Sequence, residues 1–329
     1  MKIRNAFEPP AEIGELCSNM LFAYYLLGWL EIVKVRVNPT TFGSYESMVK
    51  QTIEPYFRPK PITLKDLEAR RIQQFYSEKL RTVKPNSVIH YHAVIHQALK
   101  YAMKTDLVAQ NVAMKVDRPK KNDFQPVFLD AAELQHLFEV VKGTKLELPV
   151  LVAAFYGFRR GEVLGLKWDA IDFERGTLTI KRTVTSVNVG RKTQIIEQES
   201  AKTKSSMRTL PLVGRFKEYF AEVKSAQELN KQVCGNCYNY EYDGFVFVDE
   251  LGERMRPDYL TSQFPSFIQR HGMKKMRFHD LRHSCASLLL ANGVPLKQIQ
   301  DWLGIRIFPP RQIFTPIWIT VRNSPRRRR

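Results

Sequence analysis

Residues 20–116 repeat hydrophobic side chains at the spacing of amphipathic helices. Residues 62–81 (ITLKDLEARRIQQFYSEKLR) and 84–107 (KPNSVIHYHAVIHQALKYAMKTDL) carry an apolar residue every three or four positions, which is the period of one helix face. Residues 38–57 start with cap-type residues and continue to a proline near their end. The apolar run at residues 20–30 (MLFAYYLLGWL) is much shorter than the roughly 20 residues of a membrane span, so it predicts a buried helix. The whole pattern predicts a bundle of four or five helices.

The helical pattern stops at residues 117–129, where two prolines and a basic cluster lie without apolar periodicity. Such a segment is typical of an inter-domain linker. Asp130 is then expected to cap a new helix. Strand-like alternation follows in residues 176–187, 192–199 and 207–212. It predicts a small antiparallel sheet, after which helical patterns return.

These patterns predict a mainly α-helical protein with a small antiparallel β-sheet, built as two domains. The expected division is a lead-in of residues 1–19, a helical domain of residues 20–116, a linker of residues 117–129, a second domain of residues 130–305 and a basic tail of residues 306–329. The second domain holds all the predicted strands and most of the residues suited to chemistry.

The chain carries 51 lysines and arginines against 33 aspartates and glutamates, a formal net charge of +18. Such an excess favours a polyanionic partner, most often nucleic acid, and a basic enzyme without such a partner is the alternative. Cys234 and Cys237 form a single CxxC without the second pair of a zinc site. The N-terminal residues hold acids and prolines where a signal peptide has its apolar core, so we expect a cytoplasmic protein without a membrane partner.

His92 and His96 lie four residues apart in a predicted helix, a spacing that places both on one face. Two histidines in this arrangement can bind a metal ion. No acidic third ligand lies near them in the sequence. We therefore favour a packed or DNA-facing surface over a metal site.

Arg159 lies where a predicted buried helix meets a polar turn, within residues 156–172 (YGFRRGEVLGLKWDAID). An arginine in so apolar a setting needs a carboxylate or a phosphate partner. An ion pair with Glu162, three positions further on, is the purely structural alternative. Lys202 lies in a polar turn between predicted strands, where a long cation could reach a ligand. An ordinary surface lysine is the alternative there.

His279 and Arg282 lie three residues apart at the start of a predicted helix, within residues 277–293 (RFHDLRHSCASLLLANG). They project from one face of that helix, whereas Asp280 and His283 lie on other faces. A helix N-terminus that presents histidine and arginine together suits a phosphate, because charge, forked donors and the helix dipole act together.

The arginine of GFRRGE, the lysine ahead of RTLPL, and HDLRH ahead of LANG and WLG resemble the motifs of the tyrosine recombinases, or phage-type integrases. The resemblance spans residues 20–304 and is closest to the integrases of conjugative transposons and of Gram-positive phages. It implies a C-shaped two-domain clamp on DNA, with a helical core-binding domain and an α+β catalytic domain. The implied function is site-specific DNA recombination and integration, as part of a mobile genetic element.

The resemblance also implies residue roles. Arg159 and Arg282 would hold the non-bridging oxygens of the scissile phosphate, and Glu162 would orient the arginine. His279 would assist proton handling, and Lys202 would protonate the departing 5′-oxygen. No metal or other cofactor is implied, because arginines supply the positive charge and a covalent protein–DNA bond conserves the phosphodiester energy. The implied partner is duplex DNA at recombination core sites.

A histidine directly after WLG and, further on, a nucleophilic tyrosine are the remaining elements that the resemblance predicts. Ile305 stands at the histidine position, the tyrosine position falls near Thr315, and no tyrosine follows Tyr259. We therefore expect a chain that binds DNA without cutting it. Related recombinases form tetramers on DNA, and we do not expect this assembly here because the final helix is lost.

The sequence of the tail suggests how the expected tyrosine was lost. With one choice of synonymous codons for residues 306–320, translation from the third base gives DFSTTANIYAHLDY. This peptide resembles the C-terminal segment around the family's tyrosine. We expect a frameshift just before Arg306, and a truncated N-terminus because residues 1–19 are too few for an arm-binding domain. The alternatives are a genuine basic tail, a non-catalytic DNA-binding protein that modulates an intact recombinase, and a tyrosine donated in trans.

Overall fold

The computed structural model describes residues 15–122, 127–189, 192–199 and 207–305. The chain divides into two compact units, of which the first comprises residues 1–125 and 185–196 and the second comprises the rest. Lys202, the basic tail and most of the predicted lead-in lie outside the described residues. Within the described ranges, no helix combines the length and the apolarity needed to cross a membrane.

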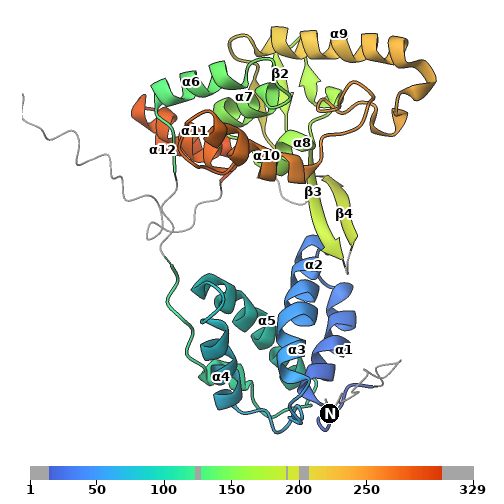
Figure 1. Cartoon of the computed structure of the whole chain (residues 1–329), viewed down its shortest axis with the longest axis vertical. Coiled ribbons are helices and arrows are strands. Elements are labelled where there is room, and N and C mark those ends of the chain that lie inside the picture. The colour runs from blue at the N-terminus through green and yellow to red at the C-terminus, as the bar shows by residue number, and fades with distance from the viewer. Residues whose placement is uncertain (1–14, 123–126, 190–191, 200–206, 306–329) are drawn as a thin grey trace, which may run out of the picture. The chain divides into compact units, whose positions relative to one another are not determined.

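The first unit is built mainly from helices, as the hydrophobic pattern predicts (Figure 1). They are α1 (Phe22–Lys34), α2 (Pro39–Met48), η1 (Val49–Ile53), α3 (Glu54–Phe57), α4 (Ala69–Lys79), α5 (Pro85–Lys104) and η2 (Val112–Lys115). Prolines begin α2 and α5 at a position where a helix needs no amide donor. The predicted helix 38–57 is observed as α2, η1 and α3 in succession, with η1 in the wider π form. Pro55 in α3 lacks the amide for a regular bond, which accounts for the widening before it.

Aromatic side chains fill the core of this unit. Phe22 and Phe57 meet edge to face with ring centroids 5.0 Å apart, and Phe57 lies 5.6 Å from Phe75. The hydroxyl of Tyr25 on α1 donates to the carbonyl oxygen of Ala98 on α5 at 2.7 Å, so this buried polar group has a partner. These contacts hold α1, α3, α4 and α5 around one hydrophobic core.

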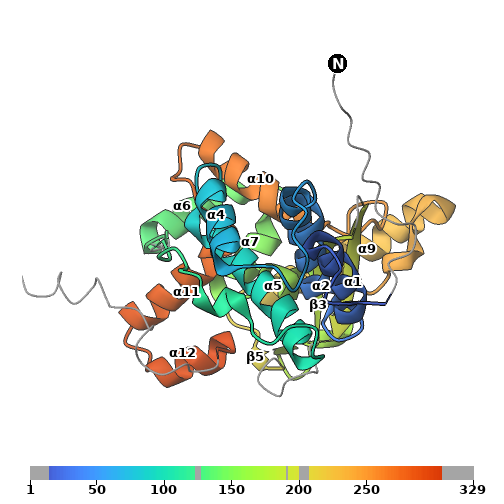
Figure 2. The ribbon, with the colours of Figure 1, turned by 90° about the horizontal axis from the view of Figure 1, so that it is seen from below.

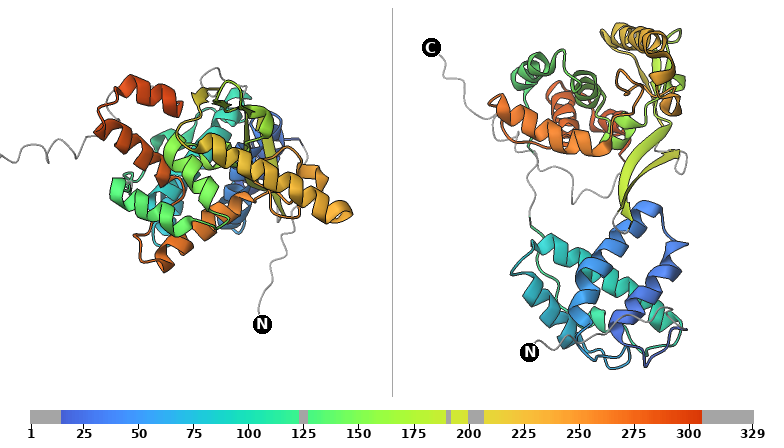
Figure 3. Two further views of the ribbon diagram at one scale, coloured as in Figure 1. Left: turned by 90° about the horizontal axis from the view of Figure 1, so that it is seen from above. Right: turned by 45° about the vertical axis from the view of Figure 1, so that its right-hand side comes forward.

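The second unit surrounds the apolar helix α7 with other helices. Its helices are α6 (Ala131–Val141), α7 (Glu147–Tyr156), α8 (Arg160–Leu164), η3 (Trp168–Ala170), α9 (Phe216–Cys234), η5 (Gly235–Cys237), η6 (Tyr240–Tyr242), α10 (Pro257–Arg270), α11 (Asp280–Ala291) and α12 (Leu296–Leu303). Helix α7 packs against α6 and α11, and α11 packs against α12 (Figures 2 and 3). Helix α8 packs against α7 and α10. This arrangement places the ends of α7, α8, α11 and α12 together.

Antiparallel strands accompany the helices and confirm the predicted fold class; the three-stranded sheet belongs to the second unit, and most of β3 and β4 (residues 185–196) groups with the first. The strands β1 (Ile171–Asp172), β2 (Thr177–Thr179) and β5 (Thr209–Pro211) form a three-stranded sheet in the order β1-β2-β5. Leu178 pairs with both Ile171 and Leu210 in its register. The strands β3 (Arg182–Val189) and β4 (Lys192–Glu199) form a separate two-stranded sheet.

The sequence pattern joined residues 176–187 into one strand, and the structure divides them between two sheets. The chain leaves the first sheet after Ile180, whose amide donates to the carbonyl oxygen of Arg208. It then passes so close to Gly165 that a Cβ atom there would lie 2.6 Å from the carbonyl oxygen of Arg182. This close approach of two backbones fixes where β3 begins, and a pattern of side chains cannot reveal it.

Asp130 caps α6, as the sequence predicts. Its Oδ1 accepts a hydrogen bond from the amide of Glu133 at 2.8 Å, and the Glu133 carboxylate accepts one from the amide of Asp130 at 2.9 Å. This reciprocal pair is a capping box, which satisfies two amides that the first helical turn would leave unbonded.

Replacement of Asp130 by alanine should therefore lower the free energy of unfolding by about 1 kcal/mol. The matched control is Glu139→Ala on the exposed face of the same helix, where we expect a smaller change. Urea unfolding of both variants, followed by circular dichroism, measures the difference. Equal midpoints for the two variants would contradict the capping role.

Candidate functional site

The turn between α7 and α8 brings Arg159 to the surface. Helix α7 ends at Gly157 in the left-handed conformation, with φ of 63°. A Cβ atom at this position would lie 2.2 Å from the Leu303 side chain and 3.4 Å from the sulfur of Cys285. Glycine is therefore required both for the backbone conformation and for the close packing of α11 and α12. Arg159 follows in extended conformation as the residue before α8.

Glu162 is the buried carboxylate at the centre of this turn, with 5% of its surface exposed. It accepts hydrogen bonds from the Arg159 guanidinium at 2.7 Å and from the Arg159 amide at 2.9 Å. The structural alternative for Arg159, an ion pair at helical spacing, is thus present. Burial alone would raise the pKa of Glu162, but Arg208 and Arg159 outweigh it and hold that pKa below its usual value.

Arg208 is a second partner of Glu162 that the sequence analysis missed. Its two terminal nitrogens lie 3.0 and 3.4 Å from the carboxylate oxygens, and its guanidinium lies 5.4 Å from the ring centroid of Phe158. The alternation of residues around β5 could have predicted this partner. Arg208 alternates with Leu210 on the buried face around β5, while Thr209 and Pro211 are exposed. A basic residue at a buried strand position predicts an acidic partner.

Arg282 lies on α11 with 5% of its surface exposed. Its terminal nitrogens donate to the carbonyl oxygens of Gly157 and Leu303, both at 2.5 Å. Burial and the neighbouring cations Arg159 and Arg208 lower its pKa to about 9. The guanidinium of Arg159 reaches the carbonyl oxygen of Gly304 at 3.4 Å. The carbonyls of Leu303, the last residue of α12, and of Gly304, which follows it, therefore accept hydrogen bonds from Arg282 and Arg159 respectively.

His279 lies one turn before Arg282 at the start of α11, on the exposed side of the cluster. Partial desolvation and the nearby groups His283, Arg282 and Arg159 lower its pKa, so the imidazole is neutral at neutral pH. The His279 and His283 rings meet edge to face at 5.6 Å. Neutral imidazole can both donate and accept a proton, which suits it to proton transfer at a bound anion.

Asp280 fixes the start of α11 rather than facing the cluster. It is almost fully buried and accepts hydrogen bonds from the amide and the guanidinium of Arg277, at 2.8 and 2.7 Å. The hydroxyl of Ser284 one turn later accepts from the amide of Leu129 at 2.9 Å. These bonds hold the segment that carries His279 and Arg282 in place.

Four of the predicted site residues, Arg159, Glu162, His279 and Arg282, are thus brought together, with Arg208 added. Lys202 lies outside the described residues. Ile305 directly follows α12, is 43% exposed and donates its amide to the carbonyl oxygen of Gln300. The guanidiniums of Arg159, Arg208 and Arg282 contribute three positive charges against the one negative charge of Glu162, a net charge of +2. Such a cluster can bind an oxyanion.

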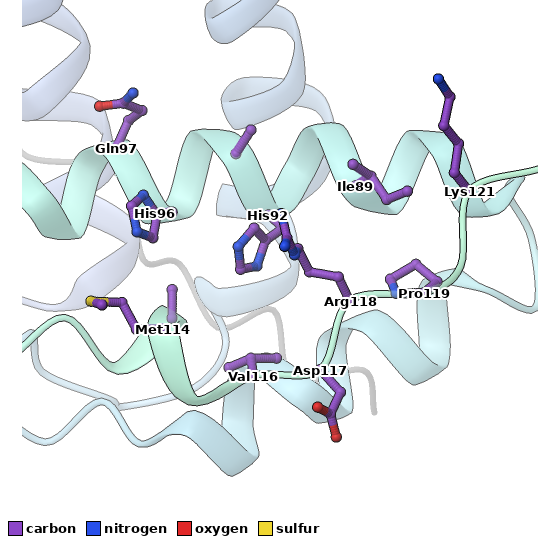
Figure 4. Close-up of a pocket in the computed structure, with 12 residues that line it drawn as sticks. Ile89, His92, His96, Gln97, Met114, Val116, Asp117, Arg118, Pro119 and Lys121 are labelled. Carbon is purple, nitrogen blue, oxygen red and sulfur yellow. The ribbon is translucent and has the colours of Figure 1, made fainter. Parts of the chain in front are cut away.

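A second candidate feature is a cavity of about 870 Å³ in the first unit (Figure 4). His92 and His96 on α5 line one side, and the segment from Met114 to Lys121, which includes Arg118, lines the other. His92 is buried and its Nδ1 lies 3.0 Å from the Tyr76 hydroxyl. Burial, Arg118 and His96 lower the pKa of His92.

The two imidazole rings, His92 and His96, stack with centroids 5.9 Å apart. In the part of the chain that the structure describes, no third metal ligand joins them. His92 is therefore a packed side chain, as one of the two favoured interpretations held, and its Tyr76 contact explains its burial. The lining includes the basic side chains of Arg118 and Lys121 together with the acidic Asp117.

The sequence is similar to known phage integrases and tyrosine recombinases. Residues 127–306 match the phage integrase family, and residues 21–80 match the N-terminal SAM-like domain of phage integrases. A XerC-like tyrosine recombinase of Caldanaerobacter subterraneus is 30% identical over 307 residues, which cover 89% of this chain and 75% of that protein. A probable integrase of prophage ps2 in Lactococcus lactis is 25% identical, over 87% of this chain and 76% of its own length.

Solved structures share the fold. The integrase of transposon Tn1549 in complex with a circular intermediate DNA superimposes with a TM-score of 0.70 at 16% identity, over 86% of this chain and 92% of that one. The λ integrase tetramer bound to a Holliday junction gives a TM-score of 0.61 at 18% identity, over 90% of this chain and 79% of that one. Because the phage integrase match covers more than half of the sequence and carries the predicted motifs, this chain belongs to the phage integrase family of tyrosine recombinases.

Proposed function

We propose that this chain acts in site-specific DNA recombination by binding duplex DNA, with one backbone phosphate held between Arg159 and Arg282. The observation that supports this most directly is the net charge of +2 in a cluster whose guanidiniums are held in place before any ligand arrives. Guanidinium groups bind phosphate through paired hydrogen bonds. The formal net charge of +18 on the whole chain favours the same polyanionic partner.

The proposed roles follow the geometry of each side chain. Arg159 faces solvent with 44% of its side chain exposed, so its guanidinium can contact a phosphate without unfolding the turn. Arg282 is buried behind it and would meet the same phosphate from the core. His279 is neutral and lies at the edge of the cluster, where it can move a proton. Lys202 keeps its proposed role in protonating the leaving oxygen.

A domain division accompanies this proposal. Residues 20–116 would form the core-binding domain, residues 117–129 the linker and residues 130–305 the catalytic domain. Arg118 and Lys121, which line the cavity beside α5 from the linker, would contact the DNA backbone. The λ integrase compared above forms a tetramer on a Holliday junction. Tetramer formation by this chain would require contacts from beyond Ile305.

We further propose that the 329-residue chain does not cleave DNA. Strand cleavage in this family uses a tyrosine nucleophile after the WLG segment, and no tyrosine follows Tyr259 in the sequence. Tyr259 itself lies on α10 and lines a different cavity, with Lys145 and Glu250. The second candidate function is therefore a DNA-binding protein that modulates an intact recombinase at shared sites, or that accepts a tyrosine from it in trans.

Salt dependence tests the phosphate site. Arg159→Ala should reduce the slope of log affinity against log salt by about 0.9 on a random-sequence duplex, because one phosphate contact is lost. Glu162 keeps Arg208 as a partner in this variant, so the turn stays folded. The control is Arg175→Ala, an exposed arginine that pairs with Asp172. Fluorescence anisotropy across a salt series gives the slopes, and equal slopes for native and Arg159→Ala proteins would refute the phosphate contact.

Covalent chemistry provides a separate test. Incubation of the whole chain with a nicked core-site duplex should give no DNA adduct that survives denaturing electrophoresis, because the chain lacks the nucleophile. An intact integrase from a related element serves as the positive control. An adduct formed by this chain alone would overturn the proposed inactivity. An adduct that appears only when an inactive tyrosine-bearing partner is added would establish donation in trans.

A further inference from the structure

Arg208 occupies a fixed and buried position beside the proposed phosphate site. Its carbonyl oxygen accepts the amide of Ile180 at 3.0 Å, and the next residues form β5, so the sheet determines where its side chain starts. Only 9% of the residue is exposed. Among the described residues, its Nε finds no hydrogen-bond partner. Within the described part of the chain, this guanidinium therefore donates its hydrogen bonds to Glu162.

Glu162 is shared between two arginines as a result. Its two oxygens receive the Arg159 amide, the Arg159 guanidinium and both terminal nitrogens of Arg208. One carboxylate carries a single negative charge and cannot neutralise two guanidiniums. Arg208 thus offsets the charge of Glu162, and the charges of Arg159 and Arg282 remain uncompensated. Arg282 does not change this balance, because its partners Gly157 and Leu303 contribute neutral carbonyls.

We infer that Arg208 is a positioning residue that sets the net charge of the phosphate site at +2 by engaging Glu162. This inference rests on the phosphate site proposed above. Without Arg208, Glu162 would neutralise Arg159 and leave a net charge of +1. With it, the full charges of Arg159 and Arg282 face the ligand. Arg208 itself does not need to touch the phosphate.

The difference between +1 and +2 matters for phosphoryl transfer. A phosphodiester carries one negative charge, and attack by an anionic oxygen adds a second to the five-coordinate species. A site of charge +2 therefore matches the transition state better than the bound substrate, which is the condition for catalysis by differential binding. Burial of Arg208 and Glu162 strengthens the effect, because charges interact more strongly where water is excluded.

Anion selectivity of the whole chain tests this charge assignment without requiring the missing nucleophile. The probes are sulfate, a dianion, and dimethyl phosphate, a monoanion, each titrated by calorimetry at one ionic strength. Arg208→Met should lower the ratio of sulfate to dimethyl phosphate affinity by about tenfold or more, since one buried unit charge is lost at an effective dielectric constant near 20. Arg208→Lys keeps the charge and should keep the ratio.

A double variant separates charge from structure. The Glu162→Gln/Arg208→Met chain loses one charge of each sign, so its net charge returns to +2 and the native ratio should return with it. It also lacks a lone buried carboxylate, which protects it from the misfolding that Arg208→Met risks. Arg182→Met is the matched control, because that arginine is ion-paired to Asp169 and Glu197 rather than to Glu162, so its loss should leave the ratio unchanged.

The outcomes distinguish this inference from the proposed function. A native chain that binds neither anion would refute the phosphate site itself. A native preference for sulfate that persists in Arg208→Met would refute the role of Arg208 and leave the phosphate site standing. A double variant that loses the preference as fully as Arg208→Met would show that Arg208 acts through structure alone, which also contradicts the charge assignment.

Discussion

The interaction on which this site depends is the shared buried carboxylate of Glu162. An isolated carboxylate at 5% exposure would be too costly to keep ionised, so its two arginines are a condition of folding as well as a part of the site. Arg159 comes from the adjoining turn, and Arg208, 46 residues away in the sequence, directly precedes the strand β5. The ion-paired group therefore ties the sheet to α8. A buried carboxylate left without any partner typically costs about 3–5 kcal/mol, so loss of both arginines would threaten the fold as well as the site.

Close backbone packing is the second constraint. Gly157 allows α11 and α12 to approach the end of α7, where Arg282 donates to carbonyls from both sides of the contact. The thiol of Cys285 donates to the carbonyl oxygen of Phe155 at 3.2 Å in the same layer. The end of α12 is thereby fixed against both Arg159 and Arg282. Any displacement of α12 would release hydrogen bonds at the arginines, so the position of this helix and the readiness of the site are coupled.

Part of the fold and of the site could be predicted from short-range patterns in the sequence. The helical bundle, the cap at Asp130 and the pairing of Arg159 with Glu162 all depend on residues within four positions of each other, where periodicity and spacing are informative. The pairing of Arg208 with Glu162 could not be predicted from local spacing, because the two residues lie 46 positions apart in the sequence. The division of the predicted sheet likewise depends on the approach of Gly165 to the backbone of Arg182, a tertiary contact that leaves no periodic trace.

The protein itself holds the arginines of the site in place. The guanidiniums of Arg159 and Arg282 are already held by Glu162, Gly157, Leu303 and Gly304, so these contacts orient them before an anion binds. Carbonyl partners satisfy hydrogen bonds without cancelling charge. The cluster therefore keeps a net positive charge that a bound anion can neutralise. Binding an anion to the folded state alone must then stabilise that state by mass action. The proposed affinity for a phosphate and the stability of the anion-bound fold are thus linked through the same uncompensated charge.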